Sequence, residues 1–561
     1  MNSERISTPP GAAGGPLSGW LQWTLIFAVF FIVGGAPAPH VNEAHYLTKA
    51  KHYWDPSYCP GDFFLDSADA HVAFYWTFGW LTKWLSLPAA AWIGRIAAWG
   101  LLAAAWQRLA RTVLDSPWFA PLSAALWVVL IDRCNFAGEW VVGGVEAKCF
   151  AYALVLAGLA DVARGQWRRP WIWFGLAATM HVLVGAWAVL AALGVWLTEP
   201  RTSRPSLRTL LPALLVGAAL SLPGLLPALA LDRGADPQAA SEAARIYVFK
   251  RLPHHLAPLS LPPNELALKL ARFGLLAGAM LILWAWSERR RASIVSTMNA
   301  LSPVATGISP AALERMFRFA GVALAANALG LFVEAALVDR PAIAARVLRY
   351  YWFRQADVAV PLAAALAGAY LSLAWLRTKS WRRIAVALAP VLFCVGVLSS
   401  VAVDRWKLPI PPALNRLEPE TNLEHVAAWQ DACRWIDRHT PPEACFIVPR
   451  AAYSFKWYAS RADVANWKDV PQDAAGVVEW HRRCQDLFPR RMTPRGKRTL
   501  DSPEKLGTER LLELARRYSA THVIARSEPA LDLPVAYSNA AIGGGEFYTI
   551  YETGQPASKS P

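Results

Sequence analysis

Acidic side chains that could carry acid–base chemistry gather between residues 41 and 87, directly after the first apolar segment. A carboxylate that enters the core of a membrane costs roughly 2.5–3.5 kcal/mol, so acids beside apolar segments are solvated, paired or functional. The stretch is therefore either an ordinary polar loop or part of a site, and Glu43 could simply pair with Lys49 or His45. The carboxylates are Glu43, Asp55, Asp62, Asp66 and Asp69.

Three later polar stretches hold further candidates. A planar guanidinium can hold a phosphate through two hydrogen bonds, so their arginines are candidate phosphate ligands. The alternative is an interfacial helix whose arginines pair with anionic lipid. Adjacent histidines rarely bind a metal without further partners, so we predict no metal site, while a divalent cation stays open as a cofactor. The candidates are Asp132 and Glu139 in residues 132–148, Arg251, His254 and His255 in residues 232–264, and Arg349 and Arg354 in residues 339–356.

The elements that must position these residues are membrane helices. Of the 561 residues, 55% are hydrophobic, and they form blocks long enough to span a bilayer. The 28 tryptophans are typical of interfacial belts. We predict a polytopic α-helical membrane protein with about eleven transmembrane helices. The segments are roughly 20–36, 89–109, 119–131, 147–162, 171–183, 184–198, 209–230, 266–287, 318–338, 357–376 and 384–403.

Basic clusters between these segments predict the orientation in the cell (inner) membrane. The net charge of +15 is typical of positive cytoplasmic loops, and no basic stripe with interleaved aromatics indicates nucleic acid as a partner. Placing all clusters inside puts the N-terminus in the cytoplasm and the C-terminal region outside. The clusters are Arg108/Arg111, Arg164/Arg168/Arg169, Arg201/Arg204/Arg208, Arg289/Arg290/Arg291 and Arg377/Lys379/Arg382/Arg383.

This topology divides the chain into three parts. Residues 1–19 are a disordered cytoplasmic N-terminus, residues 20–403 form the transmembrane domain, and residues 404–561 form a small extracytoplasmic α/β domain. The outer loops are then 37–88, 132–148, 232–264 and 339–356. Residues 73–87 are too short to span and are predicted to lie on the outer surface, with aromatic side chains at headgroup depth. These side chains are Phe74, Tyr75, Trp76, Trp80 and Trp84.

The C-terminal region alternates helical and strand patterns. Apolar periodicity predicts helices over Leu423–His439 and Glu509–Tyr518, and β-rich runs predict strands over Ala444–Val448, Ala520–Ala525 and Phe547–Tyr551. The Gly543-Gly544-Gly545 run precedes a strand rather than opening a helix, so it is not a phosphate loop. If this domain lies outside the cytoplasm, one disulfide bond within it is possible. The available cysteines are Cys433, Cys445 and Cys484.

Two short motifs, in residues 42–46 and 60–65, occur together with Arg95 and the layout of residues 20–403. In this combination the chain resembles the GT-C superfamily of membrane glycosyltransferases, whose donors are typically polyprenyl-phosphate sugars. In that superfamily an Asp-Glu or Asp-Asp pair is common where this chain has Asn42-Glu43, so one carboxylate is left. The end of the chain also resembles uncharacterised bacterial multi-spanning proteins that carry a C-terminal domain of unknown function, through Trp435-Ile436…Thr440-Pro441 and Arg461…Lys468. The superfamily resemblance is carried by Asn42-Glu43-Ala44-His45-Tyr46, Pro60-Gly61-Asp62-Phe63-Phe64-Leu65, Arg95 with Arg108/Arg111, and the layout of residues 20–403.

The resemblance implies a transferase that works on the outer face of the membrane. Inverting transfer needs a base for the acceptor hydroxyl and positive charge on the departing phosphate. Glu43 is the expected base, assisted by Asp132 and Glu139. The expected partners are a polyprenyl-phosphate sugar donor and membrane lipids. The candidate substrate-binding residues are Asn42, Asp62, Arg251, His254, His255, Arg349 and Arg354.

Two other functions stay open. A transporter or lipid-handling protein would favour inverted repeats and ionisable residues deep in the spans, whereas this sequence shows no obvious repeat and most candidate charges lie at the outer rim. A non-catalytic protein with a GT-C-like fold is the second alternative, and Asn42 is the residue that favours it.

Overall fold

The computed structural model describes residues 16–556 except 232, 299–309, 378–379, 416, 418–420, 494–495 and 540–546. Residues 1–15 of the predicted disordered N-terminus and Lys379 therefore lie outside the described residues, as do the side chains of Arg289–Arg291. The described chain is mostly helical, with a small sheet near its C-terminus.

A helix coincides with each of the apolar segments expected from the sequence. Six of the described helices, α4, α9, α12, α13, α15 and α16, are long and apolar enough to cross a membrane, and α8 and residues 18–34 are apolar but shorter. The chain is therefore a multi-pass membrane protein, while the count of eleven crossings stays a prediction. The helices are α1 (Pro16–Gly34), α4 (Leu87–Ala110), α5 (Phe119–Cys134), α6 (Ala147–Ala163), α7 (Arg169–Met180), α8 (Val182–Thr198), α9 (Leu207–Ala230), α12 (Pro263–Met298), α13 (Pro310–Ala336), α15 (Arg354–Leu376) and α16 (Trp381–Lys407).

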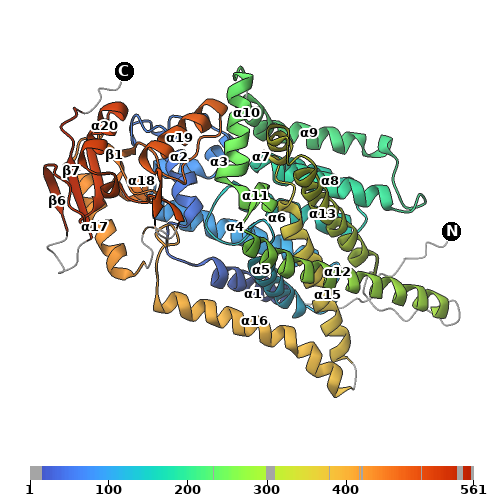
Figure 1. Cartoon of the computed structure of the whole chain (residues 1–561). Helices are drawn as coiled ribbons and strands as arrows, with labels where there is room; N and C mark the ends of the chain where they lie inside the picture. Colours follow the sequence, from blue (N-terminus) through green and yellow to red (C-terminus); the bar gives the residue numbers. More distant parts are fainter. Residues whose placement is uncertain are drawn as a thin grey trace.

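The helical bundle has two different ends. Figure 1 shows the C-terminal domain, in orange and red, at the end of the bundle opposite to where α15 ends and α16 begins. At that far end basic residues bind the ends of neighbouring helices: Arg315 pairs with Glu199 at 3.0 Å, and Arg377 pairs with Asp115 at 2.9 Å. The separation of the basic end from the C-terminal domain agrees with the expected pattern of loops. Which end faces the cytoplasm stays a prediction.

Short helices cover the end that carries the C-terminal domain. The chain leaves α1 and enters α2 (Val41–Trp54), so the first candidate residues lie on a helix rather than in a loop. Five further short elements lie between α9 and α15. They are α10 (Pro237–Ile246), the π-helical turn η2 (Tyr247–Arg251), α11 (Pro253–Leu256) and α14 (Pro341–Leu348), with the 3₁₀ turn η3 (Pro258–Ser260) after α11.

The expected surface helix over residues 73–87 is wrong in two respects. The chain forms a short helix α3 (Val72–Thr77) and a 3₁₀ turn η1 (Gly79–Lys83), and a side chain at Gly79 would meet Ala50 of α2 at 2.7 Å. Phe74 and Tyr75 are buried, because Phe74 packs against Tyr46 of α2. Of the five expected aromatics, three are exposed on this surface: Trp76, Trp80 and Trp84.

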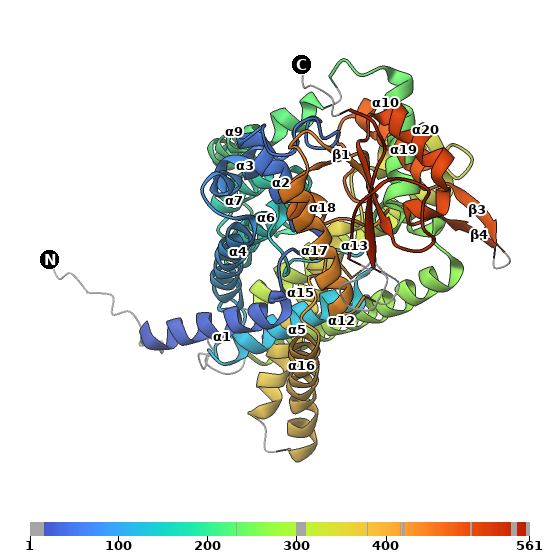
Figure 2. The ribbon, with the colours of Figure 1, turned by 90° about the vertical axis from the view of Figure 1, so that its left-hand side faces the viewer.

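The C-terminal domain is a small α/β fold built on a five-stranded sheet. Its strand order is β2-β1-β5-β7-β6; β1 is parallel to β2 and β5, and β7 is antiparallel to β5 and β6. Figure 2 shows this sheet beside α17 and α18. The elements are α17 (Leu423–His439), β1 (Cys445–Ile447), α18 (Phe455–Ala459), β2 (Ala462–Asp463), α19 (Ala474–Leu487), the hairpin β3 (Arg490–Thr493) and β4 (Gly496–Thr499), η4 (Pro503–Leu506), α20 (Thr508–Tyr518), β5 (His522–Arg526), β6 (Val535–Ser538) and β7 (Tyr548–Glu552).

Every helix and strand expected in this domain overlaps an observed one, and α17 has the expected bounds. The disulfide that was left open is absent, because all seven cysteines, which are all among the described residues, are free. The domain packs on the bundle through α10: Ala243 and Ile246 belong to the same apolar core as Trp480 and Leu487 of α19.

Candidate functional site

A cavity of about 680 Å³ lies where the short helices of the bundle meet the C-terminal domain. It brings together six of the ten candidate residues: Asn42, Glu139, Arg251, His254, His255 and Arg354. The C-terminal domain contributes one wall through the segment that follows β2. The remaining lining includes His45, Tyr46, Glu146, Lys148, His181, Tyr247, Tyr351, Tyr453, Trp467, Lys468 and Gln472.

Two carboxylates line this cavity and share a lysine. Lys148 lies 2.9 Å from an oxygen of Glu139 and 3.1 Å from an oxygen of Glu146. Glu139 has a second cation, because Arg354 Nε lies 2.7 Å from its other oxygen. Glu146 instead accepts a hydrogen bond from the Asn42 amide at 2.8 Å. Glu139 is therefore neutralised by two cations, whereas Glu146 contacts one.

Loop connections hold this acidic pair in place. Asp357 of α15 accepts hydrogen bonds from the backbone N–H groups of Phe136, Ala137 and Glu139, at 2.6 to 3.1 Å. The loop between α5 and α6 is thereby tied to α15, on which Arg354 also lies. The pairing of Glu139 with Arg354 thus follows from the packing of two elements that are far apart in the sequence.

Two other cations that line the cavity, Lys468 and Arg251, form no ion pair with a carboxylate among the described residues. Lys468 donates to the Asn42 side-chain oxygen at 2.5 Å. Burial, with Arg251 nearby, lowers the pKa of Lys468 to about 7. Arg251 Nε is buried and has no hydrogen-bond partner among the described residues, and the guanidinium lies 5.7 Å from the Trp467 ring. This side of the cavity therefore favours an anion.

Three histidines that line the cavity, His40, His45 and His255, are not additional cations. Burial lowers the pKa of His40 to about 4 and that of His255 well below its ordinary value. His255 Nδ1 contacts the carbonyl oxygen of Ala137, so that nitrogen carries the proton of a neutral ring. Burial also lowers the pKa of His45, although its hydrogen bond to Asp469 opposes this. His254 lines the cavity beside His255, their ring centres 4.1 Å apart.

Glu43 does not line the cavity but lies behind it, which argues against the expectation that it is the base. Its carboxylate is fully buried and accepts two hydrogen bonds from Arg95 at 2.5 Å. It also accepts the backbone N–H groups of His40 at 2.7 Å and Val145 at 2.8 Å. Four donors therefore occupy the carboxylate, so it has no position from which to receive a proton from a substrate. The expected alternatives, Lys49 and His45, are not its partners.

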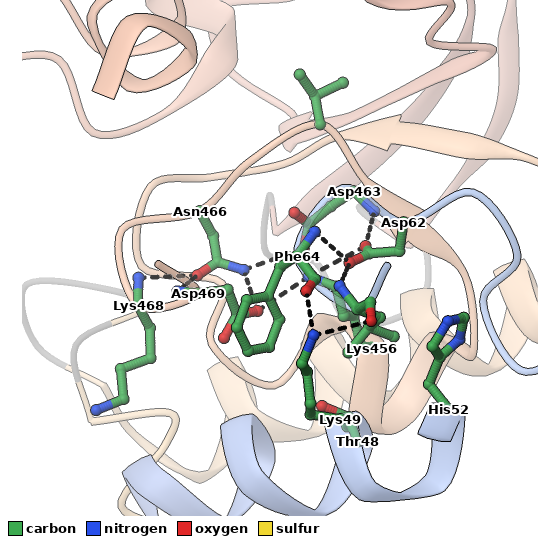
Figure 3. Close-up of polar contacts among 12 residues, drawn as sticks. Thr48, Lys49, His52, Asp62, Phe64, Lys456, Asp463, Asn466, Lys468 and Asp469 are labelled. Carbon is green, nitrogen blue, oxygen red and sulfur yellow. Dashed lines mark hydrogen bonds and ion pairs between the residues drawn. The ribbon is translucent and has the colours of Figure 1, made fainter. Parts of the chain in front are cut away.

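Asp62 is also behind the cavity, in a buried network that joins the bundle to the C-terminal domain (Figure 3). One oxygen accepts the N–H groups of Phe64 and Leu65, and the other accepts the N–H of Asp463 at 3.0 Å. Lys456 lies 3.3 Å from Asp62, 2.6 Å from Asp463 and 2.9 Å from Asp469. Asp62 thus anchors the wall of the site and does not face a substrate.

Asp469 connects this network to the cavity. One carboxylate oxygen of Asp469 lies near Lys456, and the other lies 2.9 Å from His45 Nδ1. Lys468 directly precedes Asp469 in the chain. Although burial opposes ionisation, Lys456 and His45 hold the pKa of Asp469 below its ordinary value. The buried network thus fixes the position of the segment that carries Lys468.

The two remaining candidates lie elsewhere. Asp132 is exposed at the end of α5 and pairs with Arg133 at 3.2 Å. Arg349 lines a different pocket, of about 340 Å³, between α9, α10 and α19. Neither residue lines the cavity that holds Glu139 and Arg354.

Residues that line the cavity but were missed in the sequence fall into two groups. Glu146 and Lys148 lie in a loop that had been identified, and their charge next to an apolar segment was a usable signal. Lys468 and Trp467 lie in a different domain, and no local pattern indicates that they meet Asn42. Among the described residues, no group of three His, Cys, Asp or Glu side chains is placed to hold a metal ion.

Comparisons with known proteins give limited matches. The profile of a domain of unknown function, DUF6798, matches residues 427–487, which confirms the expected C-terminal domain of this kind. No curated protein matches the chain. Among solved structures, the archaeal oligosaccharyltransferase AglB from Archaeoglobus fulgidus, in complex with an inhibitory peptide and a dolichol-phosphate, is 13% identical, with a TM-score of 0.40. The match covers 90% of this chain and 69% of that one, and we assign no residue role from it.

Proposed function

We propose that this chain is a membrane glycosyltransferase that moves a sugar from a polyprenyl-phosphate-linked donor to an acceptor at the outer face. The observation that carries the proposal is the composition of one cavity. It has two carboxylates, Glu139 and Glu146, and two cations, Arg251 and Lys468, that form no ion pair with a carboxylate among the described residues. The resemblance of the sequence to the GT-C superfamily supports the same reading.

The cavity offers each group that inverting transfer requires. The departing phosphate gains negative charge, which Arg251 and Lys468 can stabilise through charge-assisted hydrogen bonds. Either carboxylate can receive the proton of the acceptor hydroxyl. Glu146 is the preferred base because it contacts one cation, whereas Glu139 contacts two and is the weaker proton acceptor. Arg354 then positions Glu139 and adds positive charge to the cavity.

Transfer of labelled sugar from a polyprenyl-phosphate donor, measured in membranes that hold each variant, tests this assignment. General-base assistance is worth about 10²–10⁴-fold, so Glu146→Gln should lower the rate by that order while the protein still binds the donor. Glu139→Gln should lower it less, and Arg251→Gln should weaken donor binding. Asp132→Asn, on an exposed side chain outside the cavity, is the matched control.

Two results would oppose the proposal. If Glu146→Gln and Glu139→Gln both transfer sugar at the parent rate, neither carboxylate is the base. If the parent protein binds polyprenyl-phosphate donors but transfers no sugar from any of them, the chain is a non-catalytic lipid-handling protein. The donor-binding measurement separates these two results.

A further inference from the structure

A second cavity, of about 690 Å³, adjoins the first between η2 and the C-terminal domain. Trp467, Lys250 and Pro253 line both cavities, so the Trp467 side chain is part of the wall between them. Neither Glu139 nor Glu146 lines the second cavity. The remaining lining residues are Phe249, Arg450, His481, Cys484, Gln485, Phe488, Pro489, Arg490 and Thr499.

The charge of this second cavity has one sign. Lys250, Arg450 and Arg490 contribute three cations, and none of the described residues that line it is acidic. Phe249, Phe488 and Cys484 add an apolar surface. A cavity with cationic and apolar walls and no carboxylate favours a ligand that combines an anionic group with an apolar face.

Arg450 is the residue that points to a ligand. Its guanidinium lies 4.0 Å from the centre of the Trp467 ring, and its Nε is buried without a hydrogen-bond partner among the described residues. Its backbone is fixed on both sides, since its N–H donates to Asp501 at 2.8 Å and its carbonyl accepts from Trp467 at 2.9 Å. The nearby Asp501 carboxylate pairs with Lys505 instead.

A buried guanidinium nitrogen without an acceptor is unfavourable, because removing it from water costs free energy that no protein group returns. An oxyanion in the cavity would supply that acceptor, and the planar fork of Arg450 is suited to bind carboxylate or phosphate through two hydrogen bonds. The stacking on Trp467 holds the guanidinium plane in place, so little side-chain freedom is left to lose on binding.

We propose that the second cavity is a binding site for an oxyanion, a carboxylate or a phosphate group carried by a small organic molecule, with Arg450 as its central ligand. Lys250 and Arg490, both exposed, lie at the edge of the cavity and attract the anion. The site is separate from the acidic pair of the first cavity and needs no sugar transfer for its function.

Equilibrium dialysis of the purified full chain in detergent tests this site with three labelled probes. Glucose 6-phosphate carries a phosphate, glucuronate carries a carboxylate, and glucose is the neutral control. At least one anion should bind, more weakly as salt is added, and glucose should not. Binding of glucose 6-phosphate alone indicates a phosphate site, and binding of glucuronate alone indicates a carboxylate site. Equal retention of glucose, or of no probe, overturns the proposal.

Variants assign the binding to this cavity. Arg450→Gln should lower the affinity at least tenfold, and Arg490→Gln, whose exposed side chain lines the second cavity and not the first, should lower it several-fold even if Arg450→Gln fails to fold. Arg438→Gln, exposed on α17 and away from both cavities, should change nothing. A loss in Lys468→Met together with full binding in Arg450→Gln would assign the anion to the first cavity and overturn the proposal.

Discussion

Two groups of charged residues, at the end of the bundle that carries the C-terminal domain, differ in how completely their charges are satisfied. Glu43 and Arg95 are both fully buried, and four donors occupy the Glu43 carboxylate. In the adjoining cavity, Arg251 has a buried Nε for which the described part of the chain offers no hydrogen-bond partner, and Lys468 donates to an amide oxygen rather than a carboxylate. The first group is complete without a ligand, and the second is not.

This difference separates structural charge from candidate functional charge. A buried ion pair with all its hydrogen bonds made contributes to the position of helices, and removing one partner leaves an uncompensated charge. A cation that lacks an anionic partner has the capacity to bind one from outside. Acidity and a position directly after the first apolar segment, which made Glu43 the first candidate, do not distinguish these cases. The predictions below test the distinction, in order of decreasing expected effect.

Lys456→Met should have the largest effect. Lys456 is 3% exposed at the side chain and is the cation shared by Asp62, Asp463 and Asp469. Removing it leaves buried carboxylates facing one another, and breaking a buried ion pair costs about 3–5 kcal/mol. The free energy of unfolding, measured by denaturant titration in detergent, should fall by that amount. Lys505→Met, in the same domain with a side chain 37% exposed, is the control and should change stability by less than about 1 kcal/mol.

A change at Lys456 should also loosen the contact between the two domains, because Asp62 belongs to the bundle and the other two aspartates to the C-terminal domain. Limited proteolysis should then cut the linker after α16 faster than in the parent. A variant as stable as the parent would show that the network does not hold the domains together.

Glu43→Gln should have the next largest effect, a loss of about 3 kcal/mol in the free energy of unfolding. The amide keeps the shape of the side chain but leaves Arg95 buried without its anion. The double variant Glu43→Gln/Arg95→Met should recover part of that loss, because it removes both charges. The same denaturant titration measures all three proteins. A Glu43→Gln protein of parent stability whose sugar transfer falls by about 10²–10⁴-fold would instead make Glu43 the base.

The sequence predicts elements here better than contacts. The apolar blocks and the pattern of Leu423–His439 specify helices because the signal is local and periodic. The pairing of Glu43 with Arg95 joins residues 52 positions apart, and that of Lys468 with Asn42 joins residues 426 apart. Such pairings depend on how helices and domains pack, which periodicity does not describe. Phe74 and Tyr75 were placed on the surface for the same reason, since only the packing of α2 shows that they are covered.

The candidate site shows the same limit. Charged residues next to apolar segments correctly indicate the loops that form the cavity, and six candidates meet there. Which of them face the cavity depends on side-chain partners. The carboxylates of Glu43 and Asp62 accept hydrogen bonds from groups inside the protein, while Lys468 belongs to the C-terminal domain. A sequence can indicate where charge gathers, and the fold decides which charges stay available.

The affinity for an anion should depend on pH through Lys468. Burial, with Arg251 nearby, lowers its pKa from 10.5 to about 7, so Lys468 gains its charge as the pH falls through 7. Glu146, Asp469 and Lys148 also act on it. A polyprenyl-phosphate sugar is a phosphodiester with a constant charge near neutral pH. Its binding should therefore be roughly tenfold tighter at pH 6 than at pH 8, about 1.4 kcal/mol, as expected for a charge-assisted hydrogen bond.

Lys468→Met separates this effect from other titrations. The variant should bind the donor weakly and with little change between pH 6 and 8, because burial lowers the pKa of His40 to about 4 and lowers that of His255 well below its ordinary value. Binding is measured with labelled donor on purified protein in detergent. Tighter binding at pH 8 than at pH 6, or the same slope in the variant, would contradict the assignment of Lys468 as an anion ligand.

Asp132→Asn should have the smallest effect. It tests whether an exposed carboxylate outside the cavity contributes to stability or to sugar transfer. Asp132 was a catalytic candidate because it is acidic and follows an apolar segment, but its side chain is 67% exposed and its partner is the neighbouring Arg133. An exposed pair of this kind contributes little, and surface substitutions usually stay within about 0.5 kcal/mol. Unfolding and sugar transfer should both match the parent. If transfer falls about as much as in Glu146→Gln while the free energy of unfolding is unchanged, an exposed charge outside the cavity takes part in the reaction. Whether a charged group lacks partners inside the protein would then be the wrong criterion for identifying this site.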